Sequence, residues 1–585
     1  MAENKGIIID PTTLATVWHH MQTTCREMRH LLERTCQNYL IGQLRDVSVG
    51  FWGADGQMIT APLGMPNQFM ATGLAIQAVY EKIGDDLHPG DVILTNDPYG
   101  AHCPHLPDWG FIRPIFYKGR LLFFTMVRGH QEDTGGAFPG GYFANGYDIH
   151  AEGIRIPPIK VFDRGRERTD IFELVWNNVR YPKGIRIDNY AMIAATTLAE
   201  ERVLDLVERY GPETVLASLN EMMDRTERAV RSEIRSMPDG TYHGEAATDD
   251  DGTVLDEPVW VRVDLTVRGD EITLDFSRSD AQRKGFVNMI YAASYSQAVA
   301  IILCTLDPEL ADYHNEGSLR PIKIINPKGL VVNAQYPATV GASPVNVGMQ
   351  VAEAVQQAIS QARPQRAMAG WGRRRGDYVF GADPRSGERY VRTSFDFDGS
   401  AGATWGYDGP NGPCNITSLA SVRRGNVEEM EVRVPWRMLR YELATDLMGA
   451  GRWRGGAGML WEAENQGGEA GMATGSTDGD VTLPFGALDG HPALPSRSYL
   501  ERGEERIHLK PHRMYQLKDS DVIRKQSSGG GGVGPPQERD PEAVHEDVLN
   551  EIVSMQAARD IYKVAVDPKT LKIDWEETRR LRGQP

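Results

Sequence analysis

The segment that begins NDPYGAHCPHLPDWG and continues through RGHQEDTGG to YDIHAEG concentrates the side chains best suited to chemistry. Within it, His105, Asp108 and His130 offer two imidazoles and one carboxylate. Such a mixed set of nitrogen and oxygen donors suits Mn, Fe or Zn better than Ca or Mg. His102 and His150 are weaker candidates for the same divalent ion.

A predicted hairpin brings the three main candidates together. The apolar runs WGFIRPIFY and RLLFFTMVR flank a Lys-Gly pair at 118–119, which is typical of a two-residue turn. Pairing across that turn places Asp108 opposite Gly129 and Pro107 opposite His130. Cross-strand neighbours lie about 5 Å apart at Cβ, within reach of a shared ion at about 2.1 Å per ligand. The hairpin end is therefore a candidate metal site with room for water or substrate.

These histidines and the aspartate could instead have purely structural roles, without binding a metal. A single loop histidine is more often a surface or hydrogen-bonding residue than a ligand, so the hypothesis depends on all three side chains converging. The sequence has no GxxxxGK[ST] phosphate loop and no GxSxG nucleophile elbow. The glycine-rich run 529–534 could cradle an anion through its N–H groups, but a flexible connection or a close-packed glycine bundle is favoured. The run 527–536 is the one glycine cluster that looks like a linker.

Composition narrows the class of protein. The chain has 585 residues and a net charge of −17, which argues against nucleic-acid binding because that function needs a basic patch. No apolar run reaches the roughly 18 residues of a membrane span, and no signal peptide is visible. The odd, widely spaced cysteines predict neither a zinc ribbon nor a disulfide framework, and the chain is expected in the cytoplasm. These cysteines are Cys25, Cys36, Cys103, Cys304 and Cys414.

Helices and strands are predicted in blocks rather than in regular βαβ alternation, which favours an α+β fold. Asp10-Pro11 predicts a helix start. Further helices are expected at about 68–83, 190–210, 214–236, 291–306, 346–362 and 547–558. Strands are expected at about 47–52 and 57–60, and in VILT, WGFIRPIFY, RLLFFTMVR, VWVRVDLTV and EITLDF.

Four segments follow from this pattern. They are 1–90, with N-terminal helices and a hairpin; 91–240, with the candidate metal site, strands and a helical pair; 241–440, with mixed hairpins and helices; and 441–585, a glycine-rich C-terminal region.

Several sequence pieces, in order, resemble the hydantoinase B/5-oxoprolinase family. They are RDVSVGFWGADGQ, GDVILTNDPY, HLPD, EGIRIPP, NEGSLRPIKIINPKG, RYELATDLMGAGRWRGGAG, GGGGVGPPQERDP and YKVAVDPKTLKIDWEETRRLR. That family includes the B-type components of hydantoinases, the C-terminal half of 5-oxoprolinases, and large subunits of acetone and acetophenone carboxylases. Chain length and the residues around His102 look most like the 65-kDa-class (delta) subunits of the acetophenone carboxylases.

The resemblance implies partners and a fold. Family members work beside hydantoinase A-like subunits that bind ATP with Mg, and beside smaller subunits, in a hetero-oligomer. The family's metal ligands carry over onto His105, Asp108 and His130. The implied fold has two β-sheets in a barrel-like arrangement, flanking helices and Gly/Pro-rich polyproline II-like segments.

The resemblance leaves three functions open. The favoured one is an ATP-dependent, biotin-independent carboxylase that joins an aromatic ketone such as acetophenone to bicarbonate. In that enzyme Asp133 or Glu152 would act as a general base or would support a ligating histidine. The second is hydrolysis of a hydantoin or other cyclic amide, and the third is a scaffold subunit with a decayed site. Two departures from hydantoinase-like members weaken the second: Ala-His-Cys-Pro at 101–104 replaces Gly-Gly-Thr/Ser before HLPD, and His130-Gln131 replaces paired histidines.

Overall fold

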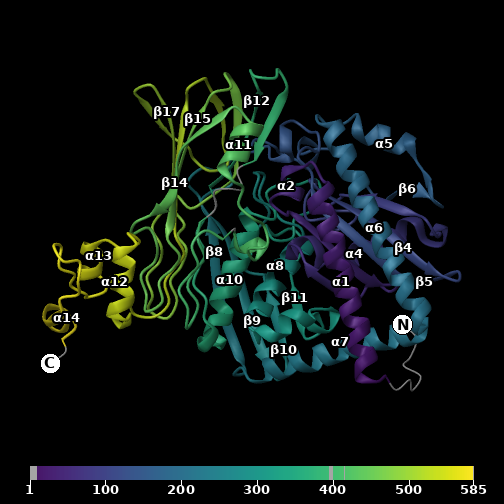
Figure 1. Ribbon diagram of the computed structural model, residues 1–585, viewed down its shortest axis with the longest axis horizontal. Coiled ribbons are helices and arrows are strands. Elements are labelled where there is room, and N and C mark those ends of the chain that lie inside the picture. Colours follow the sequence, from purple (N-terminus) through teal and green to yellow (C-terminus); the bar gives the residue numbers. More distant parts are fainter. Residues whose placement is uncertain (1–8, 374, 394–398, 414, 584–585) are drawn as a thin grey trace. The chain divides into compact units, whose positions relative to one another are not determined.

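A computed structural model describes residues 9–373, 375–393, 399–413 and 415–583. The chain forms two compact units, each assembled from separate stretches of sequence. Unit 1 comprises residues 1–241, 263–351 and 417–422, and unit 2 comprises residues 242–262, 352–416 and 423–585. The described residues confirm an α+β fold (Figure 1). Their four cysteines are free thiols, and Cys414 lies outside the described residues.

Unit 1 is built on a seven-stranded sheet in which every neighbouring pair is antiparallel. The strand order is β2-β1-β5-β4-β3-β6-β7, so the N-terminal hairpin lies beside the hairpin of the candidate site. The strands are β1 (Val47–Gly53), β2 (Met58–Leu63), β3 (Val92–Thr95), β4 (Asp108–Tyr117), β5 (Arg120–His130), β6 (Ile159–Asp163) and β7 (Arg166–Glu167).

Helices cover this sheet through one continuous apolar cluster. Helix α1 begins as predicted, because the Asp10 carboxylate accepts the N–H groups of Thr12 and Thr13. Its apolar stripe, including Trp18 and Met21, packs into the cluster with α6 (Figure 1). The helices that contribute to this cluster are α1 (Pro11–Thr35), α2 (Tyr39–Gly42), α5 (Thr169–Trp176), α6 (Pro182–Tyr210) and α7 (Pro212–Arg235). Helices α3 (Pro66–Phe69) and α4 (Thr72–Ile83) do not belong to it; Tyr80 of α4 packs edge-on against Phe124 of β5, a side chain outside the cluster.

The helix predicted over 68–83 is two helices, α3 and α4, because the chain leaves helical geometry at Ala71. This break separates the turn that carries Gln68 from the helix behind it. The helix predicted over 547–558 is likewise two, α12 (Pro541–Leu549) and α13 (Met555–Asp560). Glu551, with φ 58°, takes a left-handed conformation between them, and Ser554 caps the second helix.

The remaining elements of unit 1 surround a short sheet in which β10 pairs antiparallel with β9 and parallel with β11. Strand β9 carries the chain from unit 2 into unit 1, and α10 carries it back. These elements are β9 (Val259–Arg268), β10 (Glu271–Asp275), α8 (Tyr291–Cys304), α9 (Glu316–Leu319), β11 (Ile322–Ile325) and α10 (Asn346–Ala362).

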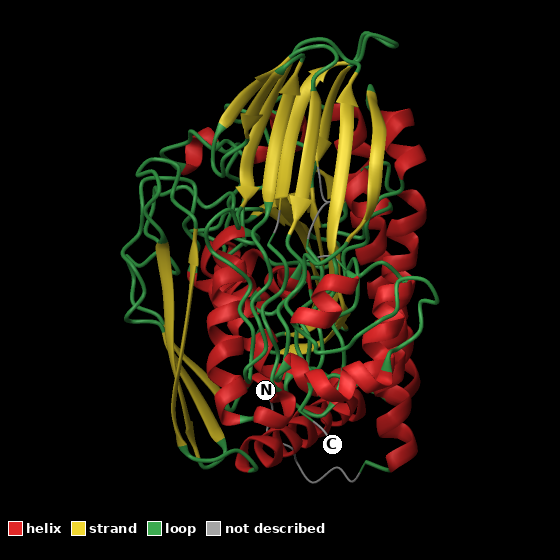
Figure 2. Cartoon of the chain, turned by 90° about the vertical axis from the view of Figure 1, so that its left-hand side faces the viewer, coloured by secondary structure: helices red, strands yellow, loops and turns green. Residues whose placement is uncertain are grey.

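Unit 2 contains two antiparallel sheets whose inner faces share one apolar cluster. Trp461 and Ile523 come from one sheet, and Val379 and Met472 from the other, so the sheets pack face to face as a sandwich (Figure 2). Burial alternates along β15 and β20, as expected for strands with one buried face. The orders are β13-β12-β16-β19 and β14-β15-β20-β17-β18.

The strands and helices of unit 2 not yet given are β8 (Gly240–Thr248), β12 (Arg375–Ala382), β13 (Arg389–Thr393), α11 (Val427–Arg433), β14 (Trp436–Ala444), β15 (Gly458–Asn465), β16 (Ala470–Thr477), β17 (Arg497–Arg502), β18 (Glu505–His508), β19 (Met514–Leu517), β20 (Val522–Ser527) and α14 (Trp575–Leu581). The expected pair of sheets in a barrel-like arrangement is not confirmed. Strands in the described part of the chain form four sheets, each with two open edges, because each unit closes its own apolar core.

The glycine run 529–534 is not a linker, which corrects the prediction for 527–536. Its residues are buried, and their N–H groups donate to carbonyls on three neighbouring stretches of chain. A Cβ on Gly530 would lie 1.9 Å from the Ala401 carbonyl oxygen, and one on Gly455 would lie 1.9 Å from that of Gly530. The extended segments below β14 in Figure 1 therefore pack at a distance that only glycine allows.

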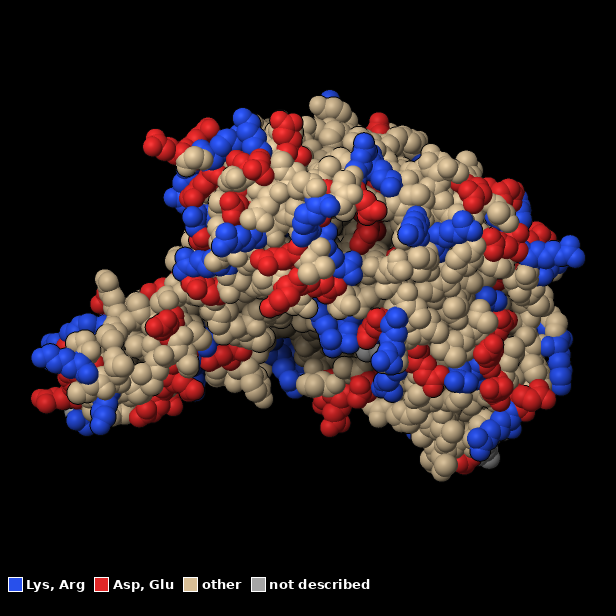
Figure 3. Space-filling view, turned by 45° about the horizontal axis from the view of Figure 1, so that its top comes forward, with Lys and Arg blue, Asp and Glu red and all other residues tan. Residues whose placement is uncertain are grey.

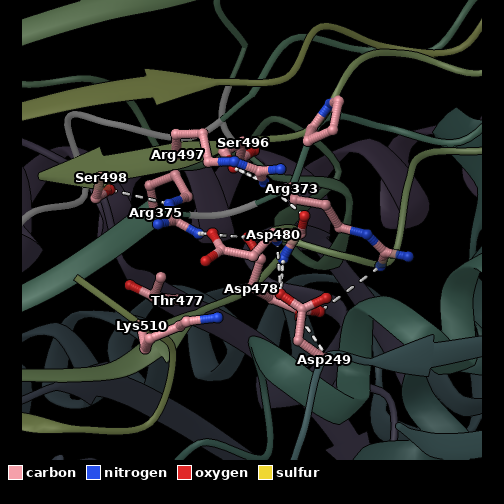
Figure 4. Close-up of polar contacts among 12 residues, drawn as sticks. Asp249, Arg373, Arg375, Thr477, Asp478, Asp480, Ser496, Arg497, Ser498 and Lys510 are labelled. Carbon is pink, nitrogen blue, oxygen red and sulfur yellow. Dashed lines mark hydrogen bonds and ion pairs between the residues drawn. The ribbon is translucent and has the colours of Figure 1, made fainter. Parts of the chain in front are cut away.

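A buried ionic network fastens a loop of unit 2 (Figure 4). The Asp249 carboxylate accepts the backbone N–H groups of residues 479–482. Although burial raises the pKa of Asp249, these donors bring it below its usual value. Arg375 pairs with Asp480 at 2.6 Å. Because each of these charges has a partner, we assign the network a structural role.

None of the described helices combines the length and apolar character that a membrane span requires. On the face shown in Figure 3, Lys and Arg side chains are interspersed with Asp and Glu rather than gathered into one stripe.

Candidate metal centre

The hairpin of β4 and β5 forms as predicted around its turn. Lys118 and Gly119 both have positive φ, at 49° and 82°, as a type I′ turn requires. A β-bulge between Ile115 and Phe116 then shifts the pairing by one residue from the register predicted for an unbroken hairpin. As a result, Asp108 rather than Pro107 lies opposite His130.

The structure brings His105, Asp108 and His130 together at this end of the sheet. One ligand atom from each lies within 4.8 Å of the others. The Asp108 Oδ1 oxygen lies 3.3 Å from His105 Nε2 and 3.5 Å from His130 Nδ1. All three side chains are buried.

Asp46 is a candidate fourth donor that the sequence did not reveal. It precedes β1, the strand that pairs with β5 on the side away from β4. Its Oδ2 oxygen lies 3.6 Å from His130 Nδ1, and its backbone carbonyl accepts the His130 N–H. Asp46, His130 and Asp108 therefore lie at the same end of three adjacent strands. A carboxylate directly before a buried strand was the available signal, but its pairing partner lies more than eighty residues away.

Gln68 positions both carboxylates. Its amide nitrogen donates to Asp46 Oδ1 at 2.8 Å and to Asp108 Oδ1 at 3.2 Å. Its own amide oxygen accepts the Ser48 hydroxyl at 2.8 Å. The buried Arg128 guanidinium donates to the backbone carbonyl of Gln68 at 2.6 Å and so fixes the turn that carries Gln68.

The backbone at Gly341 sets the tautomer of His105. Its carbonyl accepts a hydrogen bond from His105 Nδ1 at 2.8 Å. The proton of a neutral His105 ring then lies on Nδ1, so the Nε2 lone pair is available to a metal. Glu152 holds this part of the chain in place, because its Oε1 oxygen accepts the N–H groups of Val340 and Gly341 at 2.7 and 2.8 Å.

The donor set fits a divalent transition metal. Four ligands at about 2.1 Å from an ion, placed at the corners of a tetrahedron, stand about 3.4 Å apart. Three of the separations are close to that spacing: 3.3 Å for His105–Asp108, 3.5 Å for His130–Asp108 and 3.6 Å for His130–Asp46. Two imidazole nitrogens and two carboxylate oxygens suit Zn, Mn or Fe.

The electrostatics of the site couple its acids to its bases. Burial lowers the pKa of His105, but Asp108, the Gly341 carbonyl and Asp46 together outweigh that effect, and the pKa lies above its usual value. Burial raises the pKa of Asp108, yet His105 and His130 hold it well below its usual range. Burial raises the pKa of Asp46 to about 6, against the opposing effect of His130. A cation bound among these groups would offset the charge of the two buried carboxylates.

Aromatic rings close one side of the site. The Tyr142 ring stacks on His130 with centroids 6.2 Å apart and meets His105 edge-on at 5.9 Å. Phe286 lies behind Tyr142 at 6.1 Å. These rings exclude bulk water and strengthen the electrostatic interactions among the donors.

The other sequence candidates occupy different environments. The Asp133 carboxylate accepts the backbone N–H groups of Gly135, Gly140 and Arg180 and pairs with the Arg180 guanidinium at 3.1 Å. His102 is half-buried with φ 55°, and burial lowers its pKa. His150 is exposed, and its Nε2 atom lies 2.9 Å from the Tyr336 hydroxyl. Neither histidine belongs to the cluster of three.

We predict that Glu152→Ala weakens metal binding about 10- to 100-fold, the usual cost of losing an outer partner of a ligating histidine. Glu152→Gln keeps a carbonyl oxygen that can accept the Val340 and Gly341 N–H groups, so its loss should be several times smaller. Competition titration with a zinc chelator measures both affinities. Equal losses in the two variants would contradict the proposed hydrogen-bonded link.

Glu152 should also make the stability of the folded protein depend on pH. Burial raises the pKa of Glu152 from 4.5 to about 8. The folded protein therefore holds this proton where the unfolded chain has lost it, and stability falls as pH rises from 4.5 to 8, by about 1.4 kcal/mol per unit at most. In thermal unfolding of the metal-free proteins, the stability of Glu152→Gln relative to the wild type should increase as the pH rises toward 8. The exposed control Glu504→Gln should show no such gain.

Known proteins of one family are similar to this chain over nearly its whole length. A family model described as "Hydantoinase B/oxoprolinase" matches residues 10–536. The caprolactamase beta subunit of Pseudomonas jessenii is 32% identical over 96% of this chain and 97% of its own length. A crystal structure of the ATP-dependent caprolactamase from that organism superposes with a TM-score of 0.90, at 30% identity, over 99% of this chain and 100% of that one.

Two further relatives differ in their named activity. The B-type component of a putative D-/L-hydantoinase from Pseudomonas sp. (strain NS671) is 30% identical over 98% of each chain. The acetophenone carboxylase delta subunit of Aromatoleum aromaticum is 24% identical over 98% of this chain and 89% of its own length.

Proposed function

The chain belongs to the hydantoinase B/oxoprolinase family, and from that membership we propose that it is the metal-binding subunit of an ATP-dependent enzyme that hydrolyses cyclic amides. The two relatives with the higher identities are named for a lactam and for hydantoins. This proposal reverses the order favoured by the sequence alone, which placed ketone carboxylation first. We place the ATP site, with its Mg, on a hydantoinase A-like partner, because the sequence has no phosphate loop.

One observation carries the proposal: the buried side chains of His105, Asp108 and His130 converge at one end of the sheet, and the Asp46 carboxylate lies 3.6 Å from His130. His105, Asp108 and His130 would hold the ion, with Asp46 as the fourth ligand. When bound, a divalent ion supplies Lewis acidity that lowers the pKa of water and polarises a carbonyl. The partner's ATP would supply the free energy that ring opening requires.

The chain's own residues perform the remaining tasks. Hydrolysis breaks the amide C–N bond, adds a water hydroxyl to the carbonyl carbon and returns a proton to the ring nitrogen. Gln68 would hold the two carboxylates in fixed orientation, and Glu152 would hold the Gly341 carbonyl against His105. Tyr142 would keep bulk water from the reacting atoms. Asp133, whose carboxylate is engaged by Arg180 and backbone N–H groups, would order the loop after β5 rather than transfer a proton.

Ketone carboxylation remains the second candidate because of the two sequence departures near the site. Cys103, which lies within the departing stretch 101–104, is buried with its sulfur 3.6 Å from an Arg128 guanidinium nitrogen. The Gln131 side chain donates to the Gly129 carbonyl at 3.2 Å instead of offering another imidazole. In this alternative His105, Asp108 and His130 would hold the ion, which would supply Lewis acidity. The ketone would lose a proton to become an enolate, and bicarbonate would lose one oxygen as phosphate from ATP as the new C–C bond forms.

The co-expressed complex tests these candidates directly. With ATP, we expect ring-opened amino acid from ε-caprolactam, or the carbamoyl acid from hydantoin. Label from bicarbonate in a β-keto acid, formed only with acetophenone, would replace this proposal by the carboxylase. A complex that turns over substrate with no transition metal bound would overturn the metal assignment and favour the scaffold alternative.

A further inference from the structure

A second candidate site lies in unit 1, in a cavity of about 220 Å³ beside α3 and the C-terminal half of α8. Phe69 and Pro66 form one wall and Ala300 and Leu303 another. A cavity of about 150 Å³ is enough to hold benzene, so this one can accept a six- or seven-membered ring. Its lining is almost entirely apolar, and none of its side chains carries a formal charge at neutral pH.

His314 is the conspicuous polar group of the lining. Its Nε2 atom is buried and has no hydrogen-bond partner among the described residues. Phe69 packs edge-on against the imidazole with centroids 5.9 Å apart. Burial lowers the pKa of His314 to about 4, so the ring is neutral at physiological pH. Since buried polar groups are nearly always paired, this nitrogen indicates a missing partner.

Neighbouring hydrogen bonds determine what that partner must offer. The Ser318 hydroxyl donates to the Asn315 carbonyl at 2.6 Å, and the same oxygen lies 2.7 Å from His314 Nδ1. The hydroxyl has one proton and has already given it to Asn315. The proton between the two side chains must therefore come from Nδ1, which leaves Nε2 as a bare acceptor.

We propose that this cavity binds a small, neutral, ring-sized molecule that is apolar over most of its surface and donates one O–H or N–H hydrogen bond to His314 Nε2. Charged ligands are disfavoured because the apolar walls would strip them of water without compensation. A phenol-type hydroxyl and a lactam N–H share the required chemistry.

The cavity is distinct from the metal centre, and the inference does not rest on the proposed function. The lining does not include His105, Asp108, His130 or Asp46. The two sites nevertheless share α3, whose Phe69 faces the cavity while Gln68 contacts Asp46 and Asp108. Occupancy of the cavity can therefore reach the metal donors through a single turn of helix.

Paired probes test the hydrogen bond. Calorimetric titration of the full-length chain should show phenol binding about tenfold more tightly than anisole, or ε-caprolactam about tenfold more tightly than its N-methyl derivative. Preference within the first pair alone identifies a hydroxyl ligand, and preference within the second alone identifies an amide. Equal affinities within both pairs, or no binding of any probe, would overturn the proposal.

Variants locate the site. His314→Phe keeps ring volume but removes the acceptor, so the preference for donor ligands should vanish. Ala300→Phe fills the cavity and should abolish binding of all four probes. If that buried variant does not fold, Ala311→Trp, at an exposed position of the lining, tests the same point. Donor preference that survives His314→Phe, or binding that survives filling, would place the ligand elsewhere.

Discussion

His105→Ala and His130→Ala are each expected to remove the bound metal and ATP-dependent amide hydrolysis together. Each substitution deletes one of four donors and leaves the Asp108 and Asp46 carboxylates buried with less compensating charge. We expect activity to fall by more than the roughly 100-fold that loss of an outer-shell partner costs. Metal content by elemental analysis and product formation by the co-expressed complex measure both effects.

A matched control separates this effect from general damage. His150→Ala removes an exposed imidazole that contacts Tyr336 and should leave metal content and hydrolysis unchanged. Asp46→Ala extends the test to the donor that the sequence did not reveal, and it should also lose the metal. If His105→Ala retained both metal and hydrolysis, the assignment of the site would be wrong.

Gly530→Ala is expected to destabilise unit 2 by more than about 3 kcal/mol. The added Cβ would lie 1.9 Å from the Ala401 carbonyl oxygen, where backbone on both sides prevents relaxation. Because the glycines of the bundle face one another, a shift that relieves this contact would create another at Gly456 or Gly402. Thermal unfolding should show a large loss of Tm, or no soluble protein.

Gly184 provides the control for that prediction. It lies in α6, and a Cβ there would meet nothing within 4 Å. Gly184→Ala should be neutral or slightly stabilising, since alanine exceeds glycine in helix propensity by about 1 kcal/mol. Comparable unfolding temperatures for Gly530→Ala and the wild type would show that the glycine segments are not close-packed.

Local signals predicted much of the fold. The helix start at Asp10 depends on a side chain that caps its own next turn, and the Lys118-Gly119 turn needs only two residues with positive φ. Helix 346–362 was predicted with the bounds that the structure has. By contrast, the bulge after Ile115 leaves no signature in an apolar run, so the predicted register was wrong by one residue.

Long-range features were not accessible from the sequence alone. Three of the four donors lie on or just before one hairpin, so local pairing was enough to bring them together. Placing Asp46 beside the other three residues requires the pairing of β1 with β5, and no pattern within either strand specifies that pairing. The run 529–534 looked like a linker because the glycine composition of a flexible segment and that of a close-packed one are alike. Its neighbours, from 370, 447–456 and 487–491, became visible only in the folded chain.

Anomalous X-ray diffraction from crystals of the active complex, recorded at the Zn, Mn and Fe absorption edges, tests the metal centre most directly. We predict one peak at about 2.0–2.3 Å from His105 Nε2, His130 Nδ1 and the Asp108 and Asp46 carboxylates. A catalytically competent crystal with no anomalous peak between these four side chains would contradict the assignment.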